Sequence, residues 1–560
     1  MIKMQRVAYA LLLFFFFTPF AGAQQAVSNA AIASAHPLAT QAGREILDQG
    51  GNAFDAAIAV AGVLAVVEPY NSGLGGGGFF LLHRARDGRQ VMLDAREKAP
   101  LAARSNMYLD HKGEPIPQAS LVGPLAAAIP GLPAGLAHLA KRYGRLPLWQ
   151  SLSAAIRLAD MGIPIDARYR AMAESQLALL QSYSETADQY LIDRTVPKLG
   201  ELLKQPQLAA TLRMLAQQGS KGFYRGPVAH AMVAAVRKQG GIWTQADLAH
   251  YQVKERVPIV FDYRGLRIVS AALPSAGGLT LAETLNILAR YDLSQQSQAQ
   301  QMHLVAEALR RAYHDRASYM GDPDFVRIPS ARLLSSAYAE QRAASIDLHN
   351  ATPSANLRAA PSVKQGDHTT HFSIVDRAGN RVAATLSINT LFGSGFVAGK
   401  TGVLLNNEMD DFAASEQAQN IYGLAGSRAN RIAPGKRPLS SMSPTFVEDK
   451  RGVLILGTPG GSRIISMVLL AILGLEATPA PDVVALVSAP RFHHQYLPDR
   501  IEVEPGAFNA AVLDELTLKG HVVHLTQGKW GNMQAVWIDR ASGRAFAASD
   551  PRVVGGALAW

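Results

Sequence analysis

Two strand patterns separated by a short turn, within residues 371–389, constrain the fold of this chain most strongly. Residues 371–375 alternate polar and apolar side chains, which is the pattern of a β-strand. Residues 377–380 (Arg-Ala-Gly-Asn) have turn chemistry, and residues 381–389 form a second strand pattern. The sequence therefore predicts a β-hairpin. The Thr369-Thr370 pair at its head carries no functional signal by itself, because β-branched residues are common in strands.

The first 23 residues have the features of a cleavable signal peptide. Lys3 and Arg6 precede an apolar run from Val7 to Phe17, and Ala21-Gly22-Ala23 matches a small-residue cleavage site. The run is shorter than the roughly 20 residues that cross a membrane. We therefore expect cleavage, a mature chain that begins at Gln24, and a periplasmic or secreted protein. The alternative is an uncleaved membrane anchor.

Composition excludes several functions. The 560 residues contain no cysteine, so disulfides, thiol catalysis and thiolate metal sites are ruled out. Export without disulfides fits a bacterial periplasm or the outside of the cell. The net charge of +10 comes from scattered residues, so we expect no nucleic-acid partner, and no membrane association after signal removal. His314-Asp315 and His493-His494 lack metal-ligand spacing, and we expect neither a metal nor a cofactor.

Residues before the hairpin are expected to be largely helical. Residues 53–67 read as a buried helix, and residues 127–348 as mostly helical. The glycine run at 73–78 matches no phosphate-binding or dinucleotide pattern, so we expect two backbones to approach closely there. Residues 350–365 are polar and contain prolines, which is typical of a flexible tail.

Four segments after the hairpin carry a family resemblance: residues 393–395, 404–412, 437–445 and 457–463. In order and spacing they resemble the γ-glutamyltranspeptidases. The resemblance implies an α+β fold, the four-layer αββα sandwich of N-terminal-nucleophile hydrolases, in which a precursor cuts itself before a threonine.

The matching threonine is Thr369, so the cut would fall between His368 and Thr369. It would give a large subunit, 24–368, whose residues 350–368 form the flexible tail, and a small catalytic subunit, 369–560. The two subunits would form a heterodimer with the fold of one domain.

The resemblance also implies catalytic roles. Thr369 would be the nucleophile, with its freed α-amine as the base. Gly460 and Gly461 match the oxyanion hole, where backbone N–H groups meet the substrate without a Cβ in the way. Ser387 stands where the family usually has threonine. Its hydroxyl can still hydrogen-bond near the nucleophile, but it lacks the methyl group that fixes the rotamer.

The remaining matches concern the head group of a γ-glutamyl donor. Its α-carboxylate would be bound by a guanidinium and two hydroxyls, its α-ammonium by carboxylates and an amide, and a tyrosine would form a lid over both. Arg96 lies between Asp94 and Glu97, and these neighbours alone would indicate a surface ion pair. The matching residues are Arg96, Ser440 and Ser441 for the carboxylate, Asn389, Glu408 and Asp411 for the ammonium, and Tyr422 for the lid.

The resemblance thus implies transfer of a γ-glutamyl group from glutathione or a related amide to water, an amino acid or a dipeptide, through an ester on Thr369. One alternative is a β-lactam side-chain (glutaryl) acylase or another amidase of the same fold. The retained Arg96 and Asp411 argue against it, since a glutaryl donor has no α-ammonium. A second alternative is an uncleaved, non-catalytic binding protein.

Overall fold

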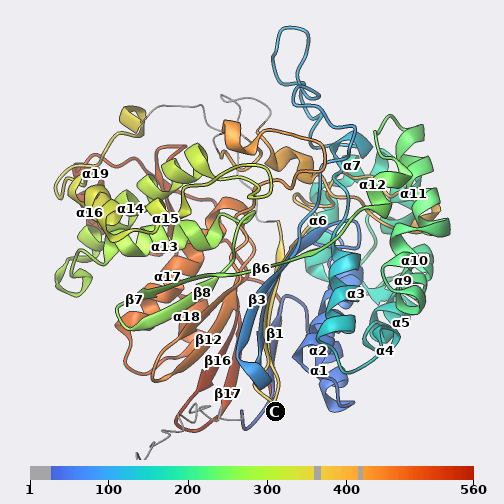
Figure 1. The fold of residues 1–560 in the computed structure, drawn as a ribbon, viewed down its shortest axis with the longest axis horizontal. Coiled ribbons are helices and arrows are strands. Elements are labelled where there is room, and N and C mark those ends of the chain that lie inside the picture. The colour runs from blue at the N-terminus through green and yellow to red at the C-terminus, as the bar shows by residue number, and fades with distance from the viewer. Residues whose placement is uncertain (1–26, 358–367, 414–419, 425) are drawn as a thin grey trace, which may run out of the picture.

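A computed structural model describes residues 27–357, 368–413, 420–424 and 426–560. Two large β-sheets lie face to face, and helices cover the outer face of each sheet (Figure 1). The predicted signal peptide and residues 358–367 of the predicted tail lie outside the described residues.

The predicted hairpin lies at the centre of the first sheet. Its strands are β9 (Thr370–Val375) and β10 (Arg381–Ser387), which pair antiparallel. The Asp376 carboxylate closes the turn by accepting hydrogen bonds from the backbone and side-chain amides of Asn380. The hairpin prediction is therefore confirmed. The sheet order is β18 (Gly556–Ala559), β1 (Ala31–Ser34), β9, β10, β2 (Gly77–Arg84), β3 (Arg89–Ala95) and β6 (Lys254–Arg256).

The second sheet draws strands from both halves of the chain. β7 and β8 form a hairpin inside the region predicted to be mostly helical, and β8 pairs with β11 from the C-terminal part. The sheet order is β17 (Ala545–Ser549), β16 (Gln534–Asp539), β12 (Gly452–Gly457), β11 (Thr445–Glu448), β8 (Leu266–Ser270) and β7 (Ile259–Tyr263). Smaller sheets contain β4 (Ile163–Pro164) with β5 (Leu202–Leu203), and β13 (Phe492–His493), β14 (Ile501–Val503) and β15 (Val523–Leu525).

Small and branched apolar side chains fill the space between the two sheets. Ala33 and Val375 from the first sheet meet Ile455 and Val536 from the second, and all four are fully buried. These positions alternate with residues that face the helices, as a strand buried on both faces requires.

The helices bury the outer faces of the sheets. α2 (Ala53–Val67) has the predicted bounds, is buried along its whole length, and begins with a capping box between Asn52 and Asp55. α1 (Pro37–Asp48) and α2 cover the first sheet, whereas α13 (Gly277–Leu288), α14 (Gln298–Tyr319) and α17 (Ile464–Ala477) cover the second. None of the described helices has the length and apolar composition to span a bilayer.

The remaining α-helices complete both layers. They are α3 (Leu132–Arg142), α4 (Leu148–Ser151), α5 (Ser153–Met161), α6 (Ala167–Ser175), α7 (Leu177–Gln181), α8 (Ser184–Tyr190), α9 (Pro206–Gln218), α10 (Lys221–Tyr224), α11 (Gly226–Lys238), α12 (Gln245–Ala249), α15 (Ser330–Leu333), α16 (Ser336–Ala344), α18 (Val483–Ser488) and α19 (Ala510–Leu518).

Segments from before and after Thr369 alternate within the first sheet. β1 lies between β18 and β9, and β10 pairs with β2 through seven residues, from Arg381 opposite His83 to Ser387 opposite Gly77. The two parts of the chain therefore share backbone hydrogen bonds, besides side-chain contacts.

Candidate active site

A pocket lies at the N-terminal end of β9. It gathers residues that are far apart in the sequence. Gly460 is not itself a lining residue, but it immediately precedes Gly461, which is one. Ten predicted site residues line the pocket: Arg96, Thr369, Ser387, Asn389, Glu408, Asp411, Tyr422, Ser440, Ser441 and Gly461.

Thr369 stands at the head of the central strand. The next residue, Thr370, donates a hydrogen bond to the buried Glu68 carboxylate over 3.0 Å and so fixes the start of β9. The Thr369 side chain is buried, and its hydroxyl contacts the carbonyl oxygen of His368. In the uncut chain, the hydroxyl therefore lies against the peptide bond that precedes it.

The end of β10 supplies two further pocket residues. Ser387 Oγ accepts a hydrogen bond from the Asn389 backbone N–H over 2.8 Å, so its own proton stays free to be donated. Asn389 has a φ of 75°, in the left-handed region that asparagine tolerates better than most residues. Its side-chain amide donates to the Asn407 carbonyl over 3.0 Å. The turn thus directs the chain from the sheet into the pocket wall.

The glycine run packs as predicted. A Cβ on Gly75 would lie 1.9 Å from the Leu404 carbonyl oxygen, and one on Gly76 would lie 2.1 Å from the Ser387 carbonyl oxygen. No side chain fits at either contact. The expectation of two closely approaching backbones is confirmed, and the contact brings the 404–412 segment against β2 and β10.

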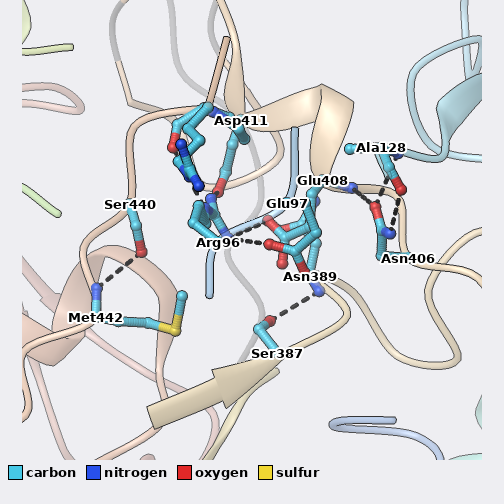
Figure 2. A network of polar contacts seen from close by, with 12 residues as sticks. Arg96, Glu97, Ala128, Ser387, Asn389, Asn406, Glu408, Asp411, Ser440 and Met442 are labelled. Carbon is cyan, nitrogen blue, oxygen red and sulfur yellow. Dashed lines mark hydrogen bonds and ion pairs between the residues drawn. The ribbon is translucent and has the colours of Figure 1, made fainter. Parts of the chain in front are cut away.

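Asn406 fastens this segment to the N-terminal part of the chain. Its amide donates to the carbonyls of Gly75 and Ala128 over 2.6 and 2.8 Å. Its Oδ1 accepts from the N–H groups of Ala128 and Glu408 over 3.1 and 2.9 Å (Figure 2). All four hydrogen-bonding positions of the side chain are used, so Asn406 fixes the backbone that carries Glu408.

Arg96 lies at the centre of a buried ion-pair network rather than on the surface. It follows β3, is 1% exposed, and donates to Glu408 over 2.6 Å and to Asp411 over 2.5 Å (Figure 2). Glu97 adds a longer contact of 3.4 Å, and the Arg96 Nε donates to the Pro438 carbonyl. The surface ion-pair interpretation is therefore wrong for Arg96.

Three carboxylates surround one guanidinium in this network. Burial raises the pKa of Glu408 well above its usual value, and it also raises the pKa of Glu97. One oxygen of each of these two carboxylates is buried and has no hydrogen-bond partner among the described residues. Because Glu408 lines the pocket, its free oxygen is a position where an incoming cation could bind.

The opposite wall carries the two predicted serines. Ser440 Oγ accepts from the Met442 N–H over 3.1 Å (Figure 2). Ser441 Oγ accepts from Arg316 of α14 over 3.1 Å. Arg316 was not among the predicted site residues. It shares a helix face with the apolar Leu309 and Ala312, and a charged residue on that face was the signal that could have identified it.

Tyr422 closes the pocket over the glycine pair. Its hydroxyl donates to the Asn389 carbonyl over 2.7 Å, and Gln495 donates to its backbone carbonyl over 3.0 Å. Gly460 and Gly461 have φ values of 138° and 55°, which favour glycine. A Cβ on Gly461 would lie 2.4 Å from the Tyr422 ring, so the second glycine is required for this packing.

The histidines with the wrong spacing for a metal site have other contacts. His493 pairs with Ser466 and Gln495, and His494 lies 3.3 Å from Asp499. His314 contacts Asp315, which also pairs with Arg342.

A threonine at the head of a central strand, between two stacked sheets and facing a pocket with charges of both signs, defines an enzyme of the N-terminal-nucleophile hydrolase fold. Solved structures agree with this class. A cephalosporin acylase from Bacillus halodurans superposes with a TM-score of 0.82 at 27% identity, over 98% of this chain and 99% of that one. A γ-glutamyltranspeptidase from Helicobacter pylori matches with a TM-score of 0.56 at 41% identity, over 57% of this chain and 93% of that one.

The sequence comparison is more specific. The gamma-glutamyltranspeptidase family profile matches residues 39–560, and the chain belongs to this family. It is 41% identical to a glutathione hydrolase proenzyme of Escherichia coli (strain K12), over 93% of this chain and 90% of that protein. It is also 36% identical to the acylase ACY 1 proenzyme of Pseudomonas sp. (strain V22), over 81% of this chain and 82% of that one.

Proposed function

We propose that the protein is a self-processing γ-glutamyltransferase and glutathione hydrolase. The observation that carries the proposal is the shared pocket. Thr369 lines it together with Arg96, which is cationic, and Asp411, which is anionic. A γ-glutamyl donor has a carbonyl to be attacked and a zwitterionic head group to be held, so one ligand can satisfy all three residues.

Processing creates the catalyst. The Thr369 hydroxyl attacks the carbonyl carbon of His368, the amide C–N bond breaks, and the nitrogen takes the hydroxyl proton. Water then hydrolyses the resulting ester, leaving a carboxylate on His368 and a free amine and hydroxyl on Thr369. Before the cut, the nitrogen is an amide and cannot act as a base. Afterwards it is an α-amine, a group whose ordinary pKa is near 8, so a useful fraction is unprotonated at working pH.

Transfer uses the same hydroxyl. The α-amine of Thr369 accepts the hydroxyl proton while Oγ1 attacks the donor γ-carbonyl, and the proton then passes to the departing amine. The backbone N–H groups of Gly460 and Gly461 stabilise the oxyanion. Water or the amino group of an amino acid or dipeptide next attacks the ester on Thr369, which releases glutamate or a new γ-glutamyl amide.

Head-group recognition selects the donor. Arg96, Ser440 and Ser441 hold the α-carboxylate, and a planar guanidinium suits this because it donates two parallel hydrogen bonds. Asn389, Glu408 and Asp411 hold the α-ammonium, for which the free oxygen of Glu408 is available. An ordinary peptide has no free α-amine and α-carboxylate on that side of its scissile bond, so it is discriminated against.

A glutaryl-type acylase is the second candidate, favoured by the similarity to the two acylases. The pocket argues against it, because Glu408 and Asp411 would face a donor without an ammonium group. We also propose export through a signal peptide cleaved before Gln24, into the periplasm or the medium.

One experiment tests the main proposal. Purified protein should run as two polypeptides on a denaturing gel, and N-terminal sequencing should place the start of the smaller at Thr369. Thr369→Ala should give one long chain without activity on γ-glutamyl-p-nitroanilide. If that variant still yields both fragments, self-cleavage by Thr369 is refuted. Faster turnover of a glutaryl amide than of the γ-glutamyl amide would favour the acylase instead.

A further inference from the structure

Arg316 is a buried cation at the pocket wall that the proposed chemistry leaves unused. It lies on α14, is 4% exposed, and lines the same pocket as Thr369. Its Nη2 donates to Ser441 Oγ over 3.1 Å, whereas its Nε is buried and has no hydrogen-bond partner in the described part of the chain. Among the residues that the structure describes, no carboxylate forms an ion pair with Arg316.

This lack of a partner is unusual for an arginine in this protein. Other buried arginines face carboxylates: Arg310 and Arg311 pair with Glu307, and Arg491 pairs with Asp550. A buried charge without a partner is strongly destabilising in general. Asp411 attracts Arg316 but contacts Arg96 instead. A pocket that holds a buried guanidinium without a carboxylate partner is suited to bind an anionic ligand.

The hydrogen bond to Ser441 decides what that hydroxyl can do. A hydroxyl has one proton, and an oxygen that accepts from a guanidinium keeps its proton for another acceptor. The Ser440 hydroxyl also keeps its proton for another acceptor, because its oxygen accepts a hydrogen bond from the Met442 N–H. Within the described residues, neither hydroxyl donates to a protein acceptor. Two neighbouring hydroxyls are thus left with protons to give to one ligand.

We propose that Arg316 is a positioning residue for the donor α-carboxylate, acting through Ser441. Its N–H group holds the Ser441 oxygen so that the hydroxyl donates into the pocket, and its positive charge adds to the attraction for the carboxylate. Arg96 cannot supply all of that attraction, because Glu97, Glu408 and Asp411 already surround it. The inference rests on the proposed function and adds a residue to its donor site.

Three p-nitroanilides separate this role from a purely structural one. The γ-glutamyl substrate has both head-group charges, the glutaryl substrate keeps only the carboxylate, and the 4-aminobutyryl substrate keeps only the amine. In Arg316→Met, kcat/KM for the two carboxylate-bearing substrates should fall roughly tenfold to a hundredfold, mainly through KM. The 4-aminobutyryl substrate should change little. An equal loss for all three substrates, or no loss for the γ-glutamyl substrate, would overturn the proposal.

Further variants keep the test decisive if Arg316→Met does not accumulate. Arg316→Lys keeps the charge without the planar fork, and should show a smaller loss confined to the same two substrates. The double variant Arg316→Lys/Ser441→Ala should lose less kcat/KM than the product of the two single fold-losses, because one residue acts through the other. Independent, multiplying losses would contradict the inference.

Arg311→Met is the matched control, since Arg311 is equally buried on α14 but pairs with Glu307 away from the pocket. It should lower stability and leave the ratios among the three substrates unchanged. Activity of the wild type distinguishes failure of the proposed function from failure of the proposed role of Arg316. If the wild type does not turn over the γ-glutamyl substrate, the proposed function fails. If the wild type prefers the γ-glutamyl substrate, but the Arg316 variants keep the wild-type ratios of kcat/KM among the three substrates, only the role of Arg316 fails.

Discussion

Arg96 and Asp411 are in direct contact, with the Arg96 Nη2 donating to Asp411 Oδ2 over 2.5 Å. The proposed function assigns these residues to opposite charges of the donor head group. Under this proposal, donor binding would separate this ion pair and replace it by two new ones, one to the α-carboxylate and one to the α-ammonium. The exchange leaves no buried charge unpaired, which avoids the penalty of removing one partner alone. Ligands with a single head-group charge do not have this advantage.

Arg96→Lys should weaken donor use without preventing processing. Lysine keeps the charge but loses the two parallel hydrogen bonds. Losing one charge-assisted hydrogen bond costs about 1.5–3 kcal/mol, so kcat/KM for γ-glutamyl-p-nitroanilide should fall roughly tenfold to a hundredfold. A denaturing gel should still show both fragments. Unchanged kinetics would exclude Arg96 from donor binding.

Asp411→Asn should change selectivity more than shape. The γ-glutamyl substrate should lose about 2–4 kcal/mol of transition-state binding, as when one partner of a buried charge pair is removed. The glutaryl analogue should lose far less, because it has no ammonium. The measurement is the ratio of the two kcat/KM values in each enzyme. A ratio equal to that of the wild type would make Asp411 structural and would favour the acylase alternative.

Asn406→Asp should destabilise the fold, because a carboxylate oxygen would replace the amide that donates to Gly75 and Ala128. Two buried carbonyls would lose their donor, and we expect the free energy of unfolding to fall by roughly 2–4 kcal/mol. Denaturant titration in a Thr369→Ala background, where the chain is expected to stay whole, measures this. Asn106→Asp, at an exposed position, is the control and should change little. Equal effects at both positions would refute the bracing role of Asn406.

Buried histidines should make the protein sensitive to acid. Burial lowers the pKa of His371, on β9, from 6.5 to about 3. Between these values the unfolded chain binds a proton that the folded chain does not, so stability is lost as the pH falls below about 6.5. At pH 5 this one residue should cost roughly 2 kcal/mol.

A His371→Gln variant tests this contribution. Glutamine cannot take up a proton, so the variant should lose less stability than the parent between pH 7.5 and pH 5, even if it begins less stable. Denaturant titrations of both proteins at the two pH values, again in the Thr369→Ala background, give the difference. If both lose the same amount, His371 does not contribute to the acid sensitivity.

Local patterns predicted the parts of the fold that are determined locally. The β9–β10 hairpin follows from alternation and turn chemistry, and the bounds of α2 follow from a continuous apolar run. β7 was missed because it is a short edge strand with half-exposed residues, inside a region interpreted as mostly helical. The site was found through motifs that resemble a family, since nothing local distinguishes Arg96 from a surface arginine. Arg316 was missed because its contact at the pocket is with Ser441, 125 positions away.

The placement of β1 between β9 and β18 has a consequence for the durability of the enzyme. A cut before Thr369 would leave strands of two polypeptides interlaced in one sheet, and the two could not part without losing that sheet. Unfolding would then release two molecules that must find each other again, so refolding becomes second-order and fails on dilution, whereas an uncut chain refolds at a rate independent of concentration. After self-cleavage, the lifetime of the active enzyme would be set by the rate of unfolding. It would therefore depend on the height of the unfolding barrier and not on the folding equilibrium.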